Sequence, residues 1–355
     1  MTTAQTSSTP APAPQTGAVT WETLELHTAQ PFGIARWTHS VYPRTFVSFT
    51  QDGLTGRGEA APNAFYGETR GTVEAVLPLL SDALRDPWDW DGLGARLSNR
   101  MPHDHPSVKC ALEMAALEWC ALSVGRPVWQ LLGLSPAPLP ESSFTVSLAE
   151  LPDMRRQARE AVQRGHGVLK VKLGTDRDEA IIEALREEAP HAALRVDANA
   201  GWTRPRAKRM LGVLDAAGVE LVEQPLAAGD LEGHAQLRAH ARVPIVADES
   251  LHHVQDVLAL ANAFDGVNLK LAKLGGPLQA LRALRLARAH GLQVMMGCMI
   301  ESSLGIAAAA HLAGLCDWAD LDGALLLADD PFSGLEWQAG TLARPTGPGW
   351  GVSRA

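Results

Sequence analysis

The chain has 355 residues, 46% of them hydrophobic and 20% charged, which is the balance of an ordinary soluble globular protein. Its 40 acidic and 31 basic residues give a formal net charge of −9, which argues against a nucleic-acid partner or an anionic membrane surface. No apolar run approaches the roughly 20 residues of a membrane span, and the four cysteines show no CxxC spacing. We therefore expect a cytoplasmic protein with free thiols.

The first 125 residues predict a small α+β unit. Residues 1–20 are rich in Ser, Thr, Ala and Pro and have no basic start, so we expect a disordered tail there instead of a signal peptide. Two antiparallel strands joined at an Asp-Gly turn are predicted over residues 45–62, and a long, largely buried helix over residues 105–125. We expect an α+β capping domain over residues 21–125, to which residues 326–355 return.

The chain from residue 143 onward alternates between short apolar runs and amphipathic helical stretches. Eight such runs occur, at residues 144–148, 169–173, 194–199, 219–225, 243–250, 266–271, 293–299 and 319–323. They start about 25 residues apart, which fits a strand, a helix and two short loops. This order predicts a TIM-like (β/α)7–8 barrel over residues 126–325. A doubly wound open sheet is the alternative, but no GxGxxG follows the first run.

Acidic residues end three consecutive runs, at the place where barrel enzymes carry their reacting groups. These are Asp197, Glu223 and Asp248. Three carboxylates that converge above a barrel, without a histidine or cysteine nearby, suit a hard cation that prefers oxygen, and Mg²⁺ above all. For each acid taken alone, the alternative is a cap on the helix that follows.

Two lysines lie one residue apart in the apolar stretch GVLKVKLG of residues 167–174. Because residues i and i+2 of a strand share a face, Lys170 and Lys172 point to the same side, and the inward side leaves Val171 to pack against helices. Lys270 ends the sixth run, across the barrel, so two lysines could serve as bases on the two faces of a substrate carbon. Lys170 and a cation would lower the pKa of Lys172. The alternative is that the pair is solvated or bound to acids of neighbouring strands.

The motifs KVK, DAN, EQP, DES and KLAKLGG follow one another on the second to sixth runs, and GRGEAAP precedes them. In this order and spacing they resemble the muconate-lactonizing subgroup of the enolase superfamily. The resemblance implies one Mg²⁺ per subunit, held by Asp197, Glu223 and Asp248. It also implies that Lys172 and Lys270 are the acid/base lysines and that Lys170 stabilises the enolate oxygen.

The eighth run distinguishes the reactions of this subgroup. Asp320 and Asp322 resemble the DxD motif that dipeptide epimerases use to hold the substrate's ammonium group, and two carboxylates would repel an anionic substrate end. The alternative is that one of them caps the next helix and the other is solvated. The resemblance thus implies an isomerase that inverts the C-terminal α-carbon of a dipeptide by two-lysine proton transfer, on L-Ala-D/L-Glu from murein peptides.

Four further residues are expected at the substrate. Arg36 would pair with an acidic substrate side chain, Thr145 would touch the substrate backbone, and Cys298 and Met299 would line the pocket. The expected partner is a small dipeptide, and a homo-oligomer is left open. The alternatives are an o-succinylbenzoate synthase or N-acylamino acid racemase of the same subgroup, and a non-catalytic barrel that binds a metal or a peptide.

Overall fold

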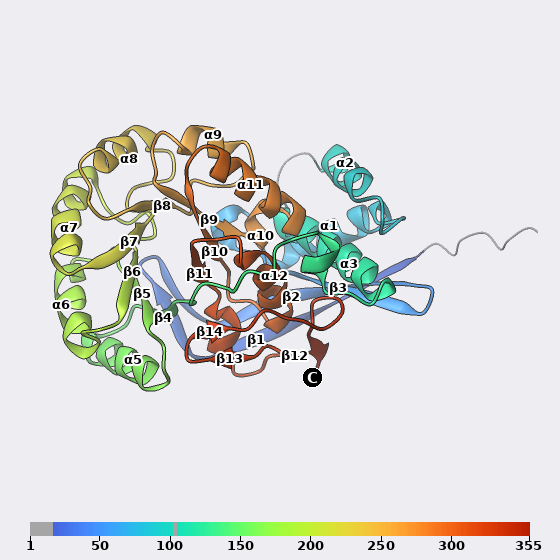
Figure 1. Cartoon of the computed structure of the whole chain (residues 1–355), viewed down its shortest axis with the longest axis horizontal. Helices are drawn as coiled ribbons and strands as arrows, with labels where there is room; N and C mark the ends of the chain where they lie inside the picture. Colours follow the sequence, from blue (N-terminus) through green and yellow to red (C-terminus); the bar gives the residue numbers. More distant parts are fainter. Residues whose placement is uncertain (1–16, 102–104) are drawn as a thin grey trace, which may run out of the picture.

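The computed structural model describes residues 17–101 and 105–355, which form a small antiparallel sheet with helices beside a parallel barrel (Figure 1). The small sheet has the order β1 (Ala18–Ile34), β2 (Trp37–Gln51) and β3 (Leu54–Ala60). Asp52 and Gly53 join the last two strands with φ of 51° and 77°, as the tight hairpin turn requires. The predicted hairpin is confirmed.

The helices of this first part are α1 (Arg70–Leu80), α2 (Trp90–Arg100), α3 (Pro106–Ser123) and α4 (Val128–Leu131), with the 3-10 turns η1 (Ala64–Tyr66) and η2 (Ser81–Ala83). The long helix α3 is buried along most of its length because it lies between β3 and the barrel. Gly56 and Gly58 permit this contact, since a Cβ on either would lie about 2 Å from a carbonyl oxygen of α3.

The barrel is one eight-stranded parallel sheet in which the strands follow chain order. Its members are β4 (Phe144–Val146), β5 (Val168–Lys172), β6 (Ala193–Asp197), β7 (Val219–Glu223), β8 (Ile245–Ala247), β9 (Gly266–Lys270), β10 (Gln293–Gly297) and β11 (Trp318–Asp320). Each predicted run overlaps one of them. The bridge between Ser142 and Ala319 brings the first and last strands together. The predicted barrel is confirmed, and the open sheet is excluded.

The helices between the strands are α5 (Leu151–Gln163), α6 (Asp178–Glu188), α7 (Arg204–Ala216), α8 (Leu231–Arg238), α9 (Asp256–Leu260), α10 (Leu271–Leu274), α11 (Pro277–Ala289) and α12 (Ser303–Ala313). They surround the strands in Figure 1. Within the described ranges no α-helix follows β11, where the chain forms only the 3-10 turn η3 (Asp322–Leu326).

The chain after η3 forms the short strands β12 (Phe332–Ser333), β13 (Trp337–Gln338), β14 (Thr341–Leu342) and β15 (Ser353–Arg354). This segment contacts the small sheet, because Ala328 N donates a 2.8 Å hydrogen bond to His27 O and the buried Trp350 donates to Arg57 O at 3.2 Å. Strand β1 begins at Ala18, so the predicted tail of residues 1–20 overlaps the sheet. The part of that tail up to residue 16 lies outside the described residues.

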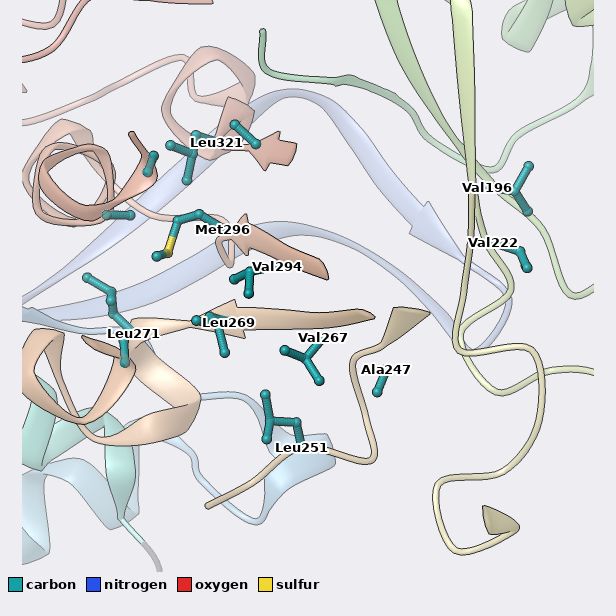
Figure 2. Packing of buried hydrophobic residues seen from close by; sticks show 14 of the residues in the cluster. Val196, Val222, Ala247, Leu251, Val267, Leu269, Leu271, Val294, Met296 and Leu321 are labelled. Carbon is teal, nitrogen blue, oxygen red and sulfur yellow. The ribbon is translucent and has the colours of Figure 1, made fainter. Parts of the chain in front are cut away.

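Successive residues of the barrel strands point alternately outward and inward. The outer face is apolar, whereas the inner face is apolar at the start of the strands and acidic at their C-terminal ends. The outer positions pack against the helices and include Val196, Val222, Ala247, Val267 and Leu269 (Figure 2). The inner face at the start of the strands is filled by a separate cluster of Leu221, Val246, Met295 and Trp318. Glu223, Asp248 and Asp320 each follow a member of this cluster by two residues. Because residues i and i+2 share a face, these acids also point inward, at the C-terminal end of the barrel.

The described cysteines are all free, and two of them, Cys110 and Cys120, are buried. Among the described residues, no helix has the length and apolar character needed to cross a membrane.

Candidate active site

A cavity of about 350 Å³ opens above the C-terminal ends of the strands, between the barrel, the β1–β2 hairpin and η1. Most of the predicted site residues line it: Arg36, Thr145, Lys170, Lys172, Asp248, Lys270, Cys298, Met299, Asp320 and Asp322. Asp197 and Glu223 are fully buried beside it, in contact with the lysines. The structure therefore brings the whole predicted set together.

The three predicted metal ligands converge. Asp197, Glu223 and Asp248 each offer a carboxylate oxygen, and these oxygens lie within 4.8 Å of one another. None of the three caps the helix that follows it, because other residues hold those positions: Thr203, Asp230 and Gln255. Glu223 Oε2 is buried without a hydrogen-bond partner. An all-oxygen set with an unsatisfied carboxylate oxygen fits a hard divalent cation such as Mg²⁺.

The charges around these acids decide their protonation. Burial raises the pKa of Asp197, but Lys172 and Lys170 outweigh it and hold that pKa below its ordinary value. The pKa of Asp248 is likewise raised by burial and lowered further by Lys270 and Lys273, so it lies well below its usual range.

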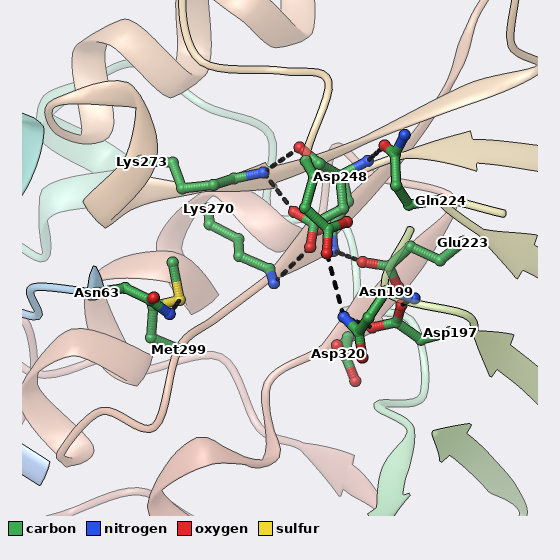
Figure 3. Close-up of polar contacts among 12 residues, drawn as sticks. Asn63, Asp197, Asn199, Glu223, Gln224, Asp248, Lys270, Lys273, Met299 and Asp320 are labelled. Atoms are coloured by element: carbon green, nitrogen blue, oxygen red, sulfur yellow. Dashed lines mark hydrogen bonds and ion pairs between the residues drawn. The ribbon is translucent and has the colours of Figure 1, made fainter. Parts of the chain in front are cut away.

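Lys172 and Lys270 approach the triad from opposite sides of the barrel. Lys172 Nζ donates a 2.7 Å hydrogen bond to Asp197 Oδ2, and Lys270 Nζ donates one of 3.0 Å to Asp248 Oδ2 (Figure 3). Burial lowers the pKa of Lys270, but Asp248 and Glu223 outweigh it and leave the pKa above its ordinary value. The lysines point inward and also pair with acids.

Lys170 joins the triad to the DxD pair. Its Nζ lies 2.5 Å from Glu223 Oε2, though not in hydrogen-bonding geometry, and donates a 2.7 Å hydrogen bond to Asp320 Oδ2. Burial and Asp197 raise the pKa of Glu223 to about 7, against the opposing effect of Lys170.

The two aspartates of the eighth strand have different surroundings. Asp320 Oδ1 accepts a 2.6 Å hydrogen bond from Ser143 Oγ, so both of its oxygens are engaged. Asp322 begins η3, but its side chain caps nothing there and accepts a 2.6 Å bond from Thr145 N. Burial raises the pKa of Asp320, but Lys170 and Lys172 outweigh it and bring it to about 2. Burial and Asp320 raise the pKa of Asp322 to about 6.

Neutral polar side chains that the sequence argument did not single out support the acids. Asn268 Nδ2 donates a 2.8 Å hydrogen bond to Glu223 Oε1, and the inner position beside it is Gly297, whose Cβ would lie 2.3 Å from Asn268 Oδ1. Gln224 Oε1 accepts from Asp248 N at 3.0 Å. Asn268 lies two residues before Lys270 and hence on the same face, a signal that could have found it.

Lys273 is a buried cation that the sequence argument also passed over. Its Nζ donates a 2.6 Å hydrogen bond to Asp248 O and a second, shorter one to Asp248 Oδ1. The ring of Tyr66 covers it at 5.7 Å, from the 3-10 turn η1. Lys273 therefore fixes the Asp248 carboxylate from the side away from Lys270.

Arg36 lies at the tip of the β1–β2 hairpin and joins it to the barrel loops. Its Nη2 is 3.1 Å from Glu249 Oε1, its Nη1 donates to Asn199 O, and its guanidinium lies 4.2 Å from the ring centroid of Phe65. The side chain is 31% exposed and lines the cavity. Pairing with an acidic substrate side chain stays a prediction for this residue.

The two pocket residues after β10 lie where the cavity meets the first part of the chain. Met299 Sδ accepts a 3.8 Å hydrogen bond from Asn63 Nδ2, and Cys298 is half-buried beside Gly323. Both line the cavity.

This fold and site define a class: barrel proteins with three converging carboxylates at the strand ends, lysines on both sides of them, and a sheet that covers the mouth. Residues 153–354 match the family model described as "Enolase C-terminal domain-like". The chain belongs to this family, within the enolase superfamily, and the resemblance inferred from the sequence motifs is confirmed.

Relatives of known name match nearly the whole chain. An L-Ala-D/L-Glu epimerase of Bacteroides thetaiotaomicron is 33% identical over 95% of this chain and 88% of its own length. A hydrophobic dipeptide epimerase of Roseobacter litoralis is 36% identical over 94% and 98%. The structure of a dipeptide epimerase from Enterococcus faecalis, complexed with Mg and L-Leu-L-Tyr, superposes with a TM-score of 0.90 at 31% identity and covers 94% and 98%. The prediction of an isomerase of the epimerase class is confirmed.

Proposed function

We propose that the protein is a Mg²⁺-dependent dipeptide epimerase, which inverts the α-carbon of the C-terminal residue of L-Ala-D/L-Glu from murein peptides. One observation carries the proposal. Lys172 on β5 and Lys270 on β9 stand four strands apart in an eight-stranded barrel, and each donates a hydrogen bond to a different member of the acidic triad. A carbon held above those carboxylates has one amine on each of its faces.

The metal site is proposed for Asp197, Glu223 and Asp248. A bound Mg²⁺ supplies positive charge where the substrate carboxylate becomes an enolate. Lys170 lies against the same acids and is 2% exposed, so it can add a hydrogen bond to that developing charge without competition from water. Asn268 holds the carboxylate of Glu223 and Lys273 that of Asp248, and Gln224 accepts a hydrogen bond from the Asp248 backbone.

The reaction needs only a proton to move. One lysine, as the neutral amine, takes the α-proton, and the electrons of the C–H bond pass into the substrate carboxylate. The other lysine, as the ammonium, returns a proton to the opposite face of the same carbon. Asp197 and Asp248 orient Lys172 and Lys270 through hydrogen bonds.

The substrate's two ends are assigned by charge. Asp320 and Asp322 would face the ammonium group, and Arg36 an acidic side chain at the other end of the cavity. Thr145, Cys298 and Met299 line the space between these ends. The names of the relatives, L-Ala-D/L-Glu epimerase and hydrophobic dipeptide epimerase, support a dipeptide substrate.

The test is proton exchange in D₂O with Mg²⁺ present. Incubation with L-Ala-L-Glu should place deuterium at the glutamate α-carbon and none at the alanine α-carbon, while L-Ala-D-Glu accumulates. Lys172→Ala and Lys270→Ala should each abolish epimerisation, and Lys208→Ala, at an exposed lysine of α7, should not. No exchange on any of a panel of dipeptides would refute the proposal.

A further inference from the structure

The barrel mouth beside β11 and β4 is bordered by η3 and by a bulge of β1, where a barrel helix would otherwise follow the last strand. No α-helix follows β11 in the described chain, and the space beside α5 is covered by η3 and by a bulge in β1. The bulge separates the pair His27–Val41 from the pair Phe32–His39, so residues 28–31 of β1 lie opposite Ser40 alone. Bulges of this kind re-aim the chain next to sites of function.

Beneath this bulge lies a second cavity of about 110 Å³, the side pocket, between the bulge, β4, α5 and η3. Apolar residues that line it include Ala29, Pro31, Phe32, Phe144, Ala161 and Leu325. Phe32, Thr145 and Leu326 line both this cavity and the main one, so the side pocket adjoins the active-site cavity.

Several polar residues of the side pocket have partners within the protein. Gln157 Oε1 accepts a 2.9 Å hydrogen bond from Ser147 N, and Glu160 pairs with Arg164 at 3.8 Å. Leu325, by contrast, leaves 37% of its surface exposed. An occupant that offers apolar surface would cover Leu325 and the other apolar lining residues and remove their carbon atoms from water.

The side pocket begins where the substrate's ammonium group is expected. Thr145, which lines it, donates its N–H to Asp322, and Ser143, two residues earlier, donates to Asp320. The ammonium group and the side chain of the same residue are both attached to one α-carbon. If the ammonium group binds these aspartates, that side chain therefore begins close to them. A preceding residue is excluded, because its peptide bond would remove the ammonium group.

We infer that the side pocket is the subsite for the side chain of the substrate's N-terminal residue, and that it takes apolar side chains of about four carbons, such as leucine or methionine. The inference rests on the proposed dipeptide substrate and extends it. A water occupies about 30 Å³ in the liquid, so a pocket of about 110 Å³ holds several carbon atoms more than the methyl group of alanine. Alanine therefore fits this subsite without filling it.

The test compares Gly-L-Glu, L-Ala-L-Glu and L-Leu-L-Glu on the Mg²⁺-loaded protein, by calorimetric affinity and by proton exchange. We expect L-Leu-L-Glu to bind about tenfold more tightly than Gly-L-Glu, since one or two methylene groups in an apolar pocket have effects of this size. Ala29→Trp, at an exposed position over the pocket, should reduce the preference for L-Leu-L-Glu over Gly-L-Glu. Ala18→Trp, at an exposed position of the same strand, is the matched control.

The two proposals can fail separately because binding does not require turnover. A protein that binds L-Leu-L-Glu more tightly but exchanges no α-proton would support the subsite and contradict the epimerase activity. A protein that epimerises all three dipeptides with equal affinity, or that keeps its preference in Ala29→Trp, would overturn the subsite.

Discussion

Lys170 and Asp320 form a buried hydrogen bond of 2.7 Å that connects the converging acids Asp197, Glu223 and Asp248 to the DxD pair. Ser143 Oγ occupies the other oxygen of the same carboxylate at 2.6 Å, and Lys170 Nζ also lies 2.5 Å from Glu223 Oε2. The two clusters are therefore one network of charges. Both oxygens of Asp320 accept hydrogen bonds, from Lys170 and Ser143. We therefore expect Asp322 to be the aspartate that binds an ammonium group.

Substitution of the two aspartates should consequently have different effects on the kinetics. Asp322→Asn should raise KM for a free dipeptide by about 10- to 100-fold, the loss expected for a hydrogen bond to a charged group, and leave an N-acetylated dipeptide almost unaffected. Asp320→Asn should lower kcat for both substrates, because Lys170 loses its partner. Steady-state kinetics on the paired substrates measures the difference.

Ser143→Ala is the companion to this experiment. It removes a hydrogen bond to Asp320 and retains its charge, so it should shift kcat in the same direction as Asp320→Asn but less. If Asp322→Asn leaves full activity on an N-acylated amino acid and the free dipeptide is never a substrate, the N-acylamino acid racemase alternative holds. Equal KM effects from both aspartates would contradict the division of roles.

The pH dependence of dipeptide binding follows from Asp322. Burial and Asp320 raise the pKa of Asp322 to about 6. Only the ionised carboxylate attracts an ammonium group, so KM should be lowest near pH 7, where the substrate's α-amino group is still protonated. It should rise as pH falls below about 6, by up to tenfold per unit. The pH profile of KM for a free dipeptide measures this, and an N-acetylated dipeptide, which has no ammonium group, should lack the acid limb.

The sequence predicted the barrel and most of the site because both depend on local patterns. The period of two in each strand placed Lys170, Lys172 and Asp197 on the inner face, and the strand order brought them together. The features of the site that the sequence did not predict are contacts between residues far apart in the chain. Lys170 and Asp320 are 150 residues apart, and Arg36 and Glu249 are 213.

The sequence patterns also did not predict the neutral polar side chains of the site. Ser143, Asn268 and Gln224 belong to residue types that occur throughout surface loops, and their importance depends on the buried acids that they face. The absence of a helix after β11 was equally hidden, because residues 322–327, DGALLL, are apolar enough for a helix but form a 3-10 turn.

The metal site can be tested without turnover. Millimolar Mg²⁺ should raise the Tm of the wild-type protein by several degrees, since a ligand at 100 times its Kd adds about 2.7 kcal/mol to the free energy of unfolding. Glu223→Gln keeps the volume and loses the carboxylate, so it should remove most of that shift. Glu183→Gln, exposed on α6, should retain it. A Mg²⁺ shift of equal size in both variants would place the ion elsewhere.

Arg36 should decide between acidic and apolar C-terminal residues. If its guanidinium pairs with the substrate's acidic side chain, Arg36→Gln should lower kcat/KM for L-Ala-L-Glu at least tenfold more than for L-Ala-L-Leu, a loss typical of a charged hydrogen bond. The measurement is the ratio of the two kcat/KM values. An equal loss on both dipeptides would assign Arg36 only to holding the hairpin, through Glu249 and Asn199.

A buried acid outside the active site should contribute to the pH dependence of stability. Glu113 of α3 is 4% exposed, and its Oε1 accepts a 2.7 Å hydrogen bond from Leu278 N at the start of α11. Burial raises the pKa of Glu113 to about 8. Between about pH 4.5 and 8 the folded protein keeps a proton that the unfolded chain releases, so the stability contributed by that proton is lost as pH rises through this window.

Glu113→Gln should flatten this slope, because the amide keeps an oxygen acceptor for Leu278 N and carries no charge. We expect the variant to match the wild type at pH 5 and to exceed its Tm by a few degrees at pH 8, where a gain of 1 kcal/mol corresponds to roughly 2–4 °C. Thermal unfolding from pH 5 to 8 measures both slopes, with Glu183→Gln as the exposed control. Burial also raises the pKa of Glu118, to about 7, so part of the slope should survive in the variant. Parallel curves for wild type and Glu113→Gln would show that Glu113 is ionised in the folded protein at neutral pH.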